Sequence, residues 1–325
     1  MEPDSIQSSF LEHVRQKLPS NISFADELAE VLNISRDSAY RRIRGETLIS
    51  LDEVKKICTH YKISLDNLLA STSEMVSFHH RAIDANRFTF EMWLKSVLDN
   101  LQMINSFPNK ELIYSAKDVP LFHYFHFPEL AAFKMFFWMK SYHNYPQYAN
   151  ENYSSKHISK DLLAIGNRVL DLYYQIPSTE IWSDETVNVT LNQINYYYEC
   201  GYIGAELALQ LYDEFGKMIS IILENASSGS KNRLTSNFNL YKNEILIAET
   251  TILFKMGDKR AAFITYNTMN LLSTSQAEFC RSIETYLNNL QNKSILISTT
   301  GEKERNKFFK KMNEKILHQK NQIQN

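Results

Sequence analysis

The sequence predicts an all-α protein built from a five-helix domain over residues 1–72 and a larger helical domain over residues 75–325. Two observations support this fold class. Only 8 Gly and 7 Pro occur in 325 residues, which is few for a protein rich in β-turns. Apolar residues also recur every three or four positions through most of the chain, the period of an amphipathic helix.

The N-terminal domain begins with a predicted helix over residues 8–17, which ends before Pro19. A fourth helix is predicted to open at a capping box formed by Ser50 and Glu53. Its expected buried face is formed by Leu51, Val54, Ile57 and Cys58. Ser64 is expected to cap a short fifth helix, and residues 70–74 are the expected boundary of the domain.

Between these helices, residues 23–45 predict two short helices joined by a tight turn. Leu28 and Leu32 are four residues apart, so they share one face of the first helix. Asn33 tolerates the left-handed turn position, and Ser35 is the expected cap of the second helix.

The second helix of this pair exposes arginines. Ala39 and Ile43 are expected to face the core, and Gly45 to end the helix. The residues left on its outer face and flanks are Asp37, Ser38, Tyr40, Arg41, Arg42 and Arg44. Four Arg against one Asp give residues 36–44 a net charge of +3, although residues 1–72 have a net charge of −2. Exposed guanidinium groups on a short helix suit the DNA major groove, where Arg binds guanine.

Residues 23–69 resemble the helix-turn-helix domain of Cro and phage-repressor-like (XRE-type) regulators, and among these the BetR-like group. The matching segments are ELAEVLNIS, AYRRIRGE and SLDEVKKICTHYKISLDNLL, in the family's order and spacing. The resemblance implies a lambda-repressor-like domain whose recognition helix, residues 35–44, binds a double-stranded DNA operator. By position it assigns base contacts to Arg36, Asp37 and Arg41, and phosphate contacts to Arg44 and Thr47. Ala25 departs from the family, which often has a phosphate-binding Gln there.

The larger domain is expected to be helical. The predicted helices are 88–105, 129–142, 158–174, 184–198, 206–223, 240–256, 259–272 and 275–289. Residues 111–127 are the one place where strands could occur, but prolines interrupt them, so we expect irregular structure with short helices. Residues 227–235 are expected to form a loop.

Two stretches of this domain weakly resemble the tetratricopeptide helical hairpin. Residues 200–215 and 256–269 each contain a Gly, an Ala and a Tyr in the same order. Their alanines, Ala208 and Ala262, are 54 residues apart, which does not fit the repeat length of about 34. Any pair of packed helices explains the pattern equally well.

Three further features have two interpretations each. Three residues could ligate a metal by their type: His123, His126 and Glu129. Pro128 intervenes, however, and buried core histidines are the stronger expectation. The aromatic run 122–148 forms either an effector pocket or a core or dimer face. Seven Lys and Arg against three Glu in residues 302–325 indicate a solvated basic helix or one that contacts phosphates.

No catalytic or cofactor motif is present in the sequence. It contains no Gly-rich phosphate loop, no GxSxG and no HExxH, so neither an enzyme nor a bound cofactor is expected. Three widely separated cysteines without a CxxC argue against a zinc or disulfide framework. The sequence shows neither a signal peptide nor an apolar run long enough for a membrane helix, so we expect a cytoplasmic protein.

These observations favour a DNA-binding transcription regulator. The N-terminal domain would bind the operator, and the C-terminal domain would form a homodimer and sense a peptide or small-molecule effector. The alternative is a helical interaction scaffold whose helix-turn-helix does not bind DNA.

Overall fold

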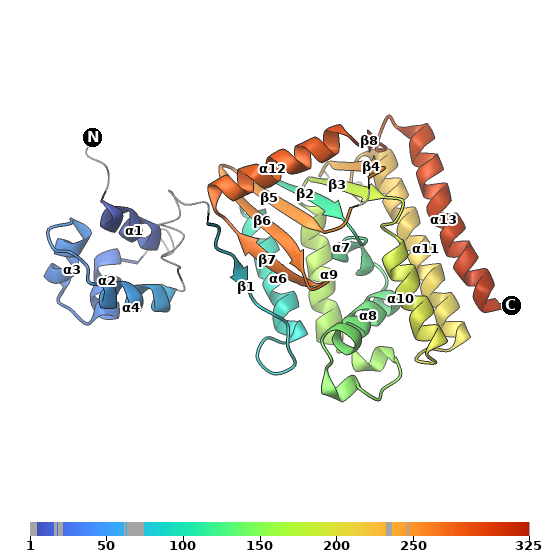
Figure 1. The fold of residues 1–325 in the computed structure, drawn as a ribbon, viewed down its shortest axis with the longest axis horizontal. Helices are drawn as coiled ribbons and strands as arrows, with labels where there is room; N and C mark the ends of the chain where they lie inside the picture. Colours follow the sequence, from blue (N-terminus) through green and yellow to red (C-terminus); the bar gives the residue numbers. More distant parts are fainter. Residues whose placement is uncertain are drawn as a thin grey trace. The chain divides into compact units, whose positions relative to one another are not determined.

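The computed structural model describes residues 5–15, 18, 22–61, 63, 75–231, 236–245 and 247–324. The chain divides into two compact units, Met1–Ser77 and Phe78–Asn325, which we call the N-terminal unit and the C-terminal unit (Figure 1). No helix in the described part of the chain combines the length and hydrophobicity needed to cross a membrane.

The described residues of the N-terminal unit form α-helices joined by short connecting segments. Its helices are α1 (Ile6–Arg15), α2 (Phe24–Leu32), α3 (Arg36–Ile43) and α4 (Leu51–Tyr61). They enclose a small core whose fully buried members include Val14, Leu28, Ala39 and Ile57. The predicted fifth helix at Ser64 and the predicted boundary at residues 70–74 lie outside the described residues.

The start of α4 confirms the predicted capping box. Ser50 donates its backbone N–H to Glu53 Oε2 at 3.0 Å, and Glu53 donates its backbone N–H to Ser50 Oγ at 3.3 Å. The prediction that Leu51 is buried is wrong, because its side chain is 83% exposed. At the first position of α4, Leu51 lies on the solvent side, and Ile57 with Val54 and Cys58 makes the contact with the core.

The C-terminal unit is an α/β fold, so the prediction of an all-α protein is wrong. Its described residues form an eight-stranded mixed sheet in the order β1-β7-β6-β5-β2-β3-β4-β8. The central strands β2 (Lys110–Ala116), β3 (Ser178–Ser183) and β4 (Phe238–Asn243) are parallel. An antiparallel set, β5 (Thr251–Met256), β6 (Lys259–Tyr266) and β7 (Asn270–Thr274), continues the sheet from β2. Two-residue strands, β1 (His79–His80) and β8 (Ile295–Leu296), end it on both sides.

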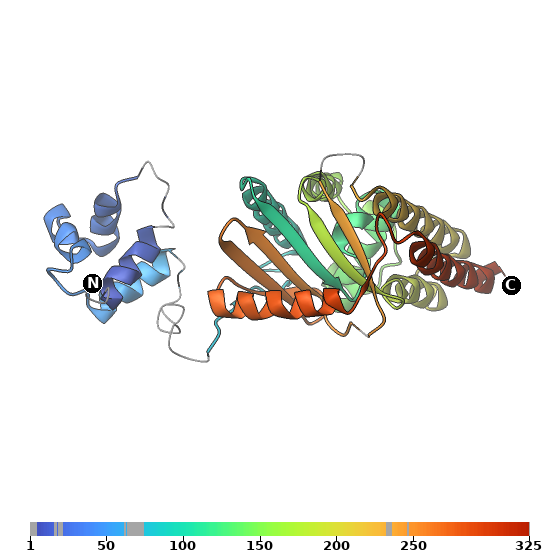
Figure 2. The same cartoon turned by 90° about the horizontal axis from the view of Figure 1, so that it is seen from above.

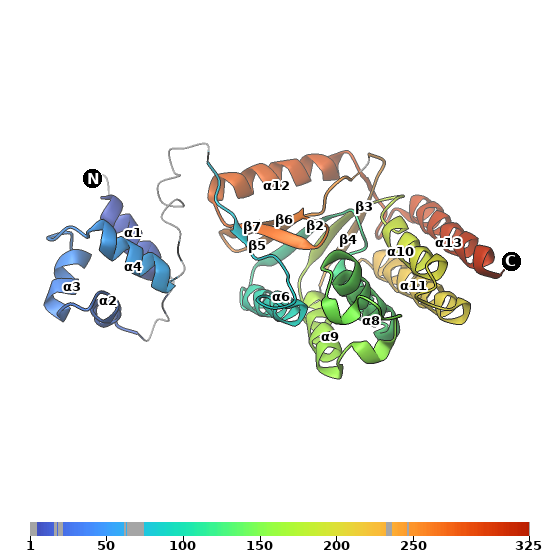
Figure 3. The ribbon, with the colours of Figure 1, turned by 60° about the horizontal axis from the view of Figure 1, so that its bottom comes forward.

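Helices cover both faces of this sheet (Figures 2 and 3). On one face lie α6 (Phe90–Asn105), α7 (Leu121–Tyr124), α8 (Pro128–Phe137), α9 (Lys160–Tyr174), α10 (Asn188–Glu199) and α11 (Ala205–Ser228). On the other face α12 (Ala277–Asn292) lies across the strands, packing on Ile113 and Leu253. The C-terminal helix α13 (Glu302–Gln324) packs against α11. The predicted basic segment at 302–325 is therefore a helix with one buried side.

Two predicted helices are strands in the structure. The segment 240–256 contains the end of β4 and all of β5, and the segment 259–272 contains β6 and part of β7. In β4 the side chains of Phe238 and Leu240 are buried and that of Asn239 is exposed, which is the period of a strand. Residues 111–127, expected to be irregular with short helices, contain most of β2 and the short α7. The expected short helix is therefore present, and the rest of the prediction is corrected by the strand.

The second tetratricopeptide-like stretch, 256–269, is a β-hairpin. Met256 pairs with Lys259 across a two-residue loop whose first residue, Gly257, has φ of 57°. Glycine adopts this left-handed conformation without steric cost, and the position is typical of hairpin loops. The glycine thus turns one strand into the next and does not end a helix, which removes the tetratricopeptide interpretation.

The aromatic run 122–148 lies largely in the core between the helices and the sheet. Phe133 and Phe136 have no exposed surface, and the ring of Phe122 stacks on that of Tyr173 with 4.5 Å between centroids. The π-helix Trp138–Tyr142 continues α8 within this run. Of the alternatives considered for this segment, the core is the one that the structure shows.

Candidate nucleic-acid interface

The turn between α2 and α3 and the two ends of α3 follow from single residues. Asn33 adopts the left-handed conformation with φ of 55°. Ser35 begins α3 as its N-cap, because its hydroxyl accepts a hydrogen bond from the backbone N–H of Ser38 at 3.2 Å. Gly45, with φ of 76°, follows Arg44, the C-cap of the helix. The predicted turn, cap and stop are all confirmed, so α3 has defined ends.

One side of α3 packs on the core and the other exposes three arginines. Ala39 is fully buried, and Ile43 packs against the same core. The side chains of Arg36, Arg41 and Arg44 are 60%, 66% and 60% exposed. The helix thus presents guanidinium groups from its first turn to its end, as a major-groove helix requires.

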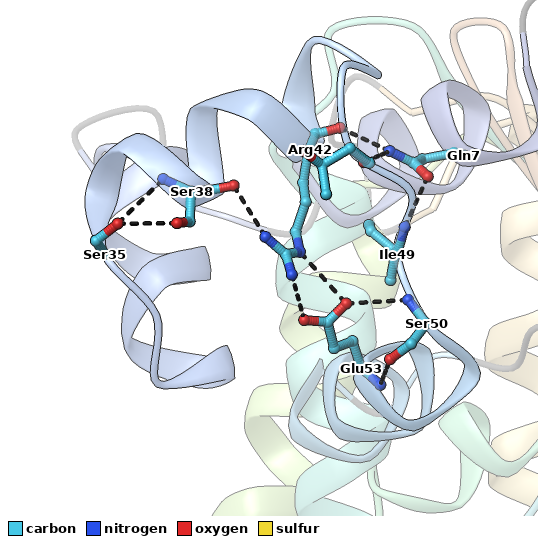
Figure 4. Close-up of polar contacts among 8 residues, drawn as sticks. Gln7, Ser35, Ser38, Arg42, Ile49, Ser50 and Glu53 are labelled. Carbon is cyan, nitrogen blue, oxygen red and sulfur yellow. Dashed lines mark hydrogen bonds and ion pairs between the residues drawn. The ribbon is translucent and has the colours of Figure 1, made fainter.

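The fourth arginine turns inward (Figure 4). Arg42 donates to Glu53 from Nη2 at 2.8 Å and from Nε at 3.3 Å, and Nη1 donates to the carbonyl of Ser38 at 3.2 Å. Burial alone would raise the pKa of Glu53, but the hydrogen bonds from Arg42 and Ser50 lower it. Arg42 thus differs from the three exposed arginines in its burial, since its side chain is only 16% exposed.

A glutamine from α1 holds the segment that follows α3 (Figure 4). Gln7 donates from Nε2 to the carbonyls of Arg42 and Thr47, both at 2.8 Å, and its Oε1 accepts the backbone N–H of Ile49 at 2.9 Å. Sequence reasoning missed this residue, since nothing in the pattern near Gln7 points to a contact some forty residues away. Its effect is to fix Thr47 relative to the end of α3.

Each exposed arginine of α3 has an acidic partner. Arg36 Nε lies 2.8 Å from Asp26 Oδ1 in α2. Glu46, just after α3, forms ion pairs with two arginines. Arg44 Nε lies 2.9 Å from Oε1, and Arg41 Nε lies 3.9 Å from Oε2. The positive charge that the sequence predicts for residues 36–44 is therefore partly balanced by residues on either side of α3.

The other predicted contact residues lie around these arginines. Asp37 is exposed and Tyr40 is 40% exposed, with the guanidinium of Arg36 placed 5.7 Å from the centre of the Tyr40 ring. Thr47 and Ser38 are half-buried. The hydrogen bond with Tyr40, together with the charge of Asp26, raises the pKa of Arg36. Of these residues, Asp37 and Tyr40 are the ones that α3 exposes beside the arginines.

Ala25, which stands where the family often has Gln, is 4% exposed. It belongs to the packed side of α2 and does not reach the surface that carries the arginines. The structure therefore offers no replacement for that phosphate contact at this position.

The histidine set considered for a metal has other partners. His123 is fully buried, and its Nε2 lies 3.1 Å from Glu180 Oε1 on β3. His126 contacts the hydroxyl of Tyr174, while Glu129 accepts a hydrogen bond from Tyr153 at 2.6 Å. No group of three potential metal ligands gathers among the described residues. The expectation of a core histidine is confirmed for His123, whereas His126 is half-buried.

Comparison with known proteins gives one match. Residues 25–68 match the family model described as helix-turn-helix, which covers α2, α3 and α4. No curated protein matches, and no solved structure matches. The N-terminal unit thus carries a helix-turn-helix of the XRE type, which indicates a DNA-binding regulator of transcription.

Proposed function

We propose that the protein is a sequence-specific regulator that inserts α3 into the major groove of its operator. The observation that carries this proposal is the set of three exposed guanidinium groups, on Arg36, Arg41 and Arg44, along one short helix. Arg41, in the last turn of α3, would be the base-reading residue that binds guanine bidentately. Arg36 and Asp37 would contact bases near the start of α3, with Ser38 and Tyr40 beside them.

Arg44 and Thr47 would contact the phosphates that flank the groove. Arg44 lies at the end of α3, and Gln7 holds the carbonyl of Thr47. Phosphate contacts set the position of a protein on the duplex and carry no sequence information by themselves. A contact surface held by buried hydrogen bonds loses little conformational freedom on binding, which favours affinity.

The first experiment is to sequence the fragments that the full chain retains from its own genomic DNA. Enrichment of one inverted repeat supports the regulator. Absence of any enrichment favours the alternative, an interaction scaffold whose helix-turn-helix does not bind DNA.

The second experiment assigns roles to the two arginines. Arg41→Ala should cost about 1–3 kcal/mol of discrimination at one base pair. Arg44→Ala should weaken binding to all sequences equally and reduce the salt slope by about one unit. Identical behaviour of the two variants on operator and random duplexes would show that our roles are wrong, provided circular dichroism shows both variants folded.

We further propose that the C-terminal unit joins two copies of the chain. A helix-turn-helix monomer presents one recognition helix, whereas a two-fold operator is read by two. A groove of about 350 Å³ between α11 and α13 offers a surface for this contact. Its lining includes Leu223, Phe309 and Leu317 beside polar residues, which are Asn306, Lys310, Asn313 and Glu314. Leu317 is 56% exposed there. Leu317→Lys should shift the full chain from dimer to monomer in light scattering, and an unchanged mass would exclude this surface.

The proposed effector site is a polar pocket of about 510 Å³ in the C-terminal unit. It lies where β2, β3 and β4 begin and is lined by Lys110, Glu111, Thr179, Asn239 and Lys255, among others. Its lining suits a small polar molecule. Asn239→Trp would occupy the pocket, so it should abolish any rise in melting temperature that a small-molecule screen finds with the native chain.

A further inference from the structure

Acidic side chains form ion pairs with the arginines that would contact DNA. Glu46 has a two-oxygen contact with Arg44, in which Nε lies 2.9 Å from Oε1 and Nη2 donates to Oε2 at 3.3 Å. The same carboxylate lies 3.9 Å from Arg41 Nε. Glu46 itself is 49% exposed and lies three residues after Ile43, the last residue of α3, so it is close in sequence to the proposed phosphate contacts Arg44 and Thr47.

We propose that Glu46 is an internal competitor of the DNA phosphate and sets the affinity of a single N-terminal unit to a low value. This inference rests on the proposed function of α3. In the free unit the carboxylate of Glu46 offers two oxygens to Arg44, the geometry that a phosphate group also offers. DNA must displace the carboxylate before it gains the full contact with Arg41 and Arg44.

Two physical effects of Glu46 both weaken the binding of DNA. Breaking an exposed ion pair removes part of the gain that a new arginine–phosphate contact brings. After displacement, the carboxylate remains next to a strongly negative backbone, where like charges repel. Both effects apply to operator and random DNA, because arginine–phosphate contacts do not depend on sequence.

The consequence for the regulator is a dependence on two N-terminal units. A unit whose exposed arginines are balanced by Glu46 and Asp26 gains little from chance contacts with DNA. Two such units on one operator add their contacts without a second loss of translational freedom. Glu46 thus restricts tight binding to the arrangement in which both units engage.

Three isosteric substitutions in the full chain provide a graded test, since each removes one negative charge from an arginine pair. Glu46→Gln releases Arg41 and Arg44, and Asp26→Asn releases Arg36 alone. Glu12→Gln is the matched control, because Glu12 pairs with Arg15 within α1, at 3.8 Å, away from α3. The three carboxylates are similarly exposed, at 49%, 49% and 58%.

The measurement is fluorescence anisotropy on operator and random duplexes across a salt series. We expect Glu46→Gln to raise affinity for both duplexes about two- to fivefold, the worth of an exposed ion pair. Asp26→Asn should act in the same direction and less strongly, and Glu12→Gln should change affinity less than twofold.

Two outcomes would overturn the inference while leaving the proposed function intact. Equal effects of Glu46→Gln and Glu12→Gln would show that only net charge matters. A loss of operator affinity with altered base preference in Glu46→Gln would show that Glu46 reads a base, such as the cytosine amino group. If the native chain and all three variants fail to bind any duplex, the inference falls together with the proposed function.

Discussion

Four arginines lie within residues 36–44, and their surroundings separate two roles that the sequence does not distinguish. Arg41 and Arg42 are neighbours, yet their side chains are 66% and 16% exposed. The sequence predicted both as contact residues, because a helical period places adjacent residues on adjoining faces. The partner that decides between them, Glu53, comes from the next helix, and no local pattern indicates that it reaches Arg42.

We expect Arg42→Ala to destabilise the N-terminal unit by about 1–3 kcal/mol, because it leaves the half-buried carboxylate of Glu53 without its charged donor. Arg41→Ala is the matched control and should change stability by no more than about 0.5 kcal/mol. Urea unfolding of residues 1–77, followed by circular dichroism, measures both. Equal destabilisation by the two variants would contradict the separation of roles.

Lys231 leads to a prediction about pH. Its fully buried ammonium donates to the carbonyls of Tyr173 and Ile176 and to Ser178 Oγ. Burial lowers the pKa of Lys231 to about 7, against the attraction of Glu180. In the unfolded chain the pKa returns to about 10.4, so the unfolded state binds more protons between these two values. Stability contributed through this group therefore rises with pH across that window and is constant below it.

The measurement is urea unfolding of the full chain from pH 6 to pH 10, followed through the fluorescence of the buried Trp182. Lys231→Met removes the titrating group, so the stability of the native chain minus that of the variant should increase as the pH rises above about 7. The variant should be less stable at every pH, because two carbonyls lose their donor. A difference that stays flat with pH would refute the assignment.

At the scale of elements, the helices were predictable and the strands were not. The segment 88–105 was predicted as a helix and forms α6, since a stripe of apolar residues with polar residues between them has only one explanation. The strand β5, with the sequence TILFKM, is buried on both faces, so it shows no alternation. A short apolar run of this kind looks the same in a buried helix and in a buried strand. Gly257, the glycine of the hairpin loop, was the residue in the sequence that could have indicated a turn between two strands.

Two glycine substitutions test that interpretation of the hairpin. Gly257→Ala should destabilise the C-terminal unit by about 1 kcal/mol, because alanine is strained at the φ of 57° that the hairpin requires. Gly216 lies inside α11 with open space around it, so Gly216→Ala should stabilise the same unit by about 0.5–1 kcal/mol. Thermal unfolding of the native chain and of both variants measures whether each substitution lowers or raises stability. The same sign for both would contradict the conformational argument.

At the scale of the whole molecule, the sequence predicted the N-terminal unit far better than the C-terminal one. The helix-turn-helix is local, since its turn, caps and apolar positions all lie within residues 23–45. The sheet is not local: β2 pairs with β3 on one side and with β5 on the other, and a large part of the unit lies between them. Strand order of this kind depends on contacts between distant segments, which a single sequence does not display.

The two units together lead to a prediction about affinity. Residues 1–77 have their own core, caps and half-buried ion pair, so they should fold alone, although a domain this small is only marginally stable. One α3 reaches a few base edges, whereas two joined copies place their helices in successive major grooves about 34 Å apart. Joining the units makes the second contact intramolecular, which should raise operator affinity about 10²–10⁴-fold in the full chain.

Anisotropy titrations of residues 1–77 and of the full chain on one operator duplex, at one salt concentration, measure this difference. The salt must be fixed because phosphate contacts make affinity depend steeply on it. The Leu317→Lys variant of the full chain is the control, since it keeps both units of the chain but should be a monomer. If it binds as tightly as the native chain, the groove between α11 and α13 does not join the copies. If residues 1–77 alone match the native chain, the C-terminal unit adds nothing to operator binding, and its role lies with an effector or another partner.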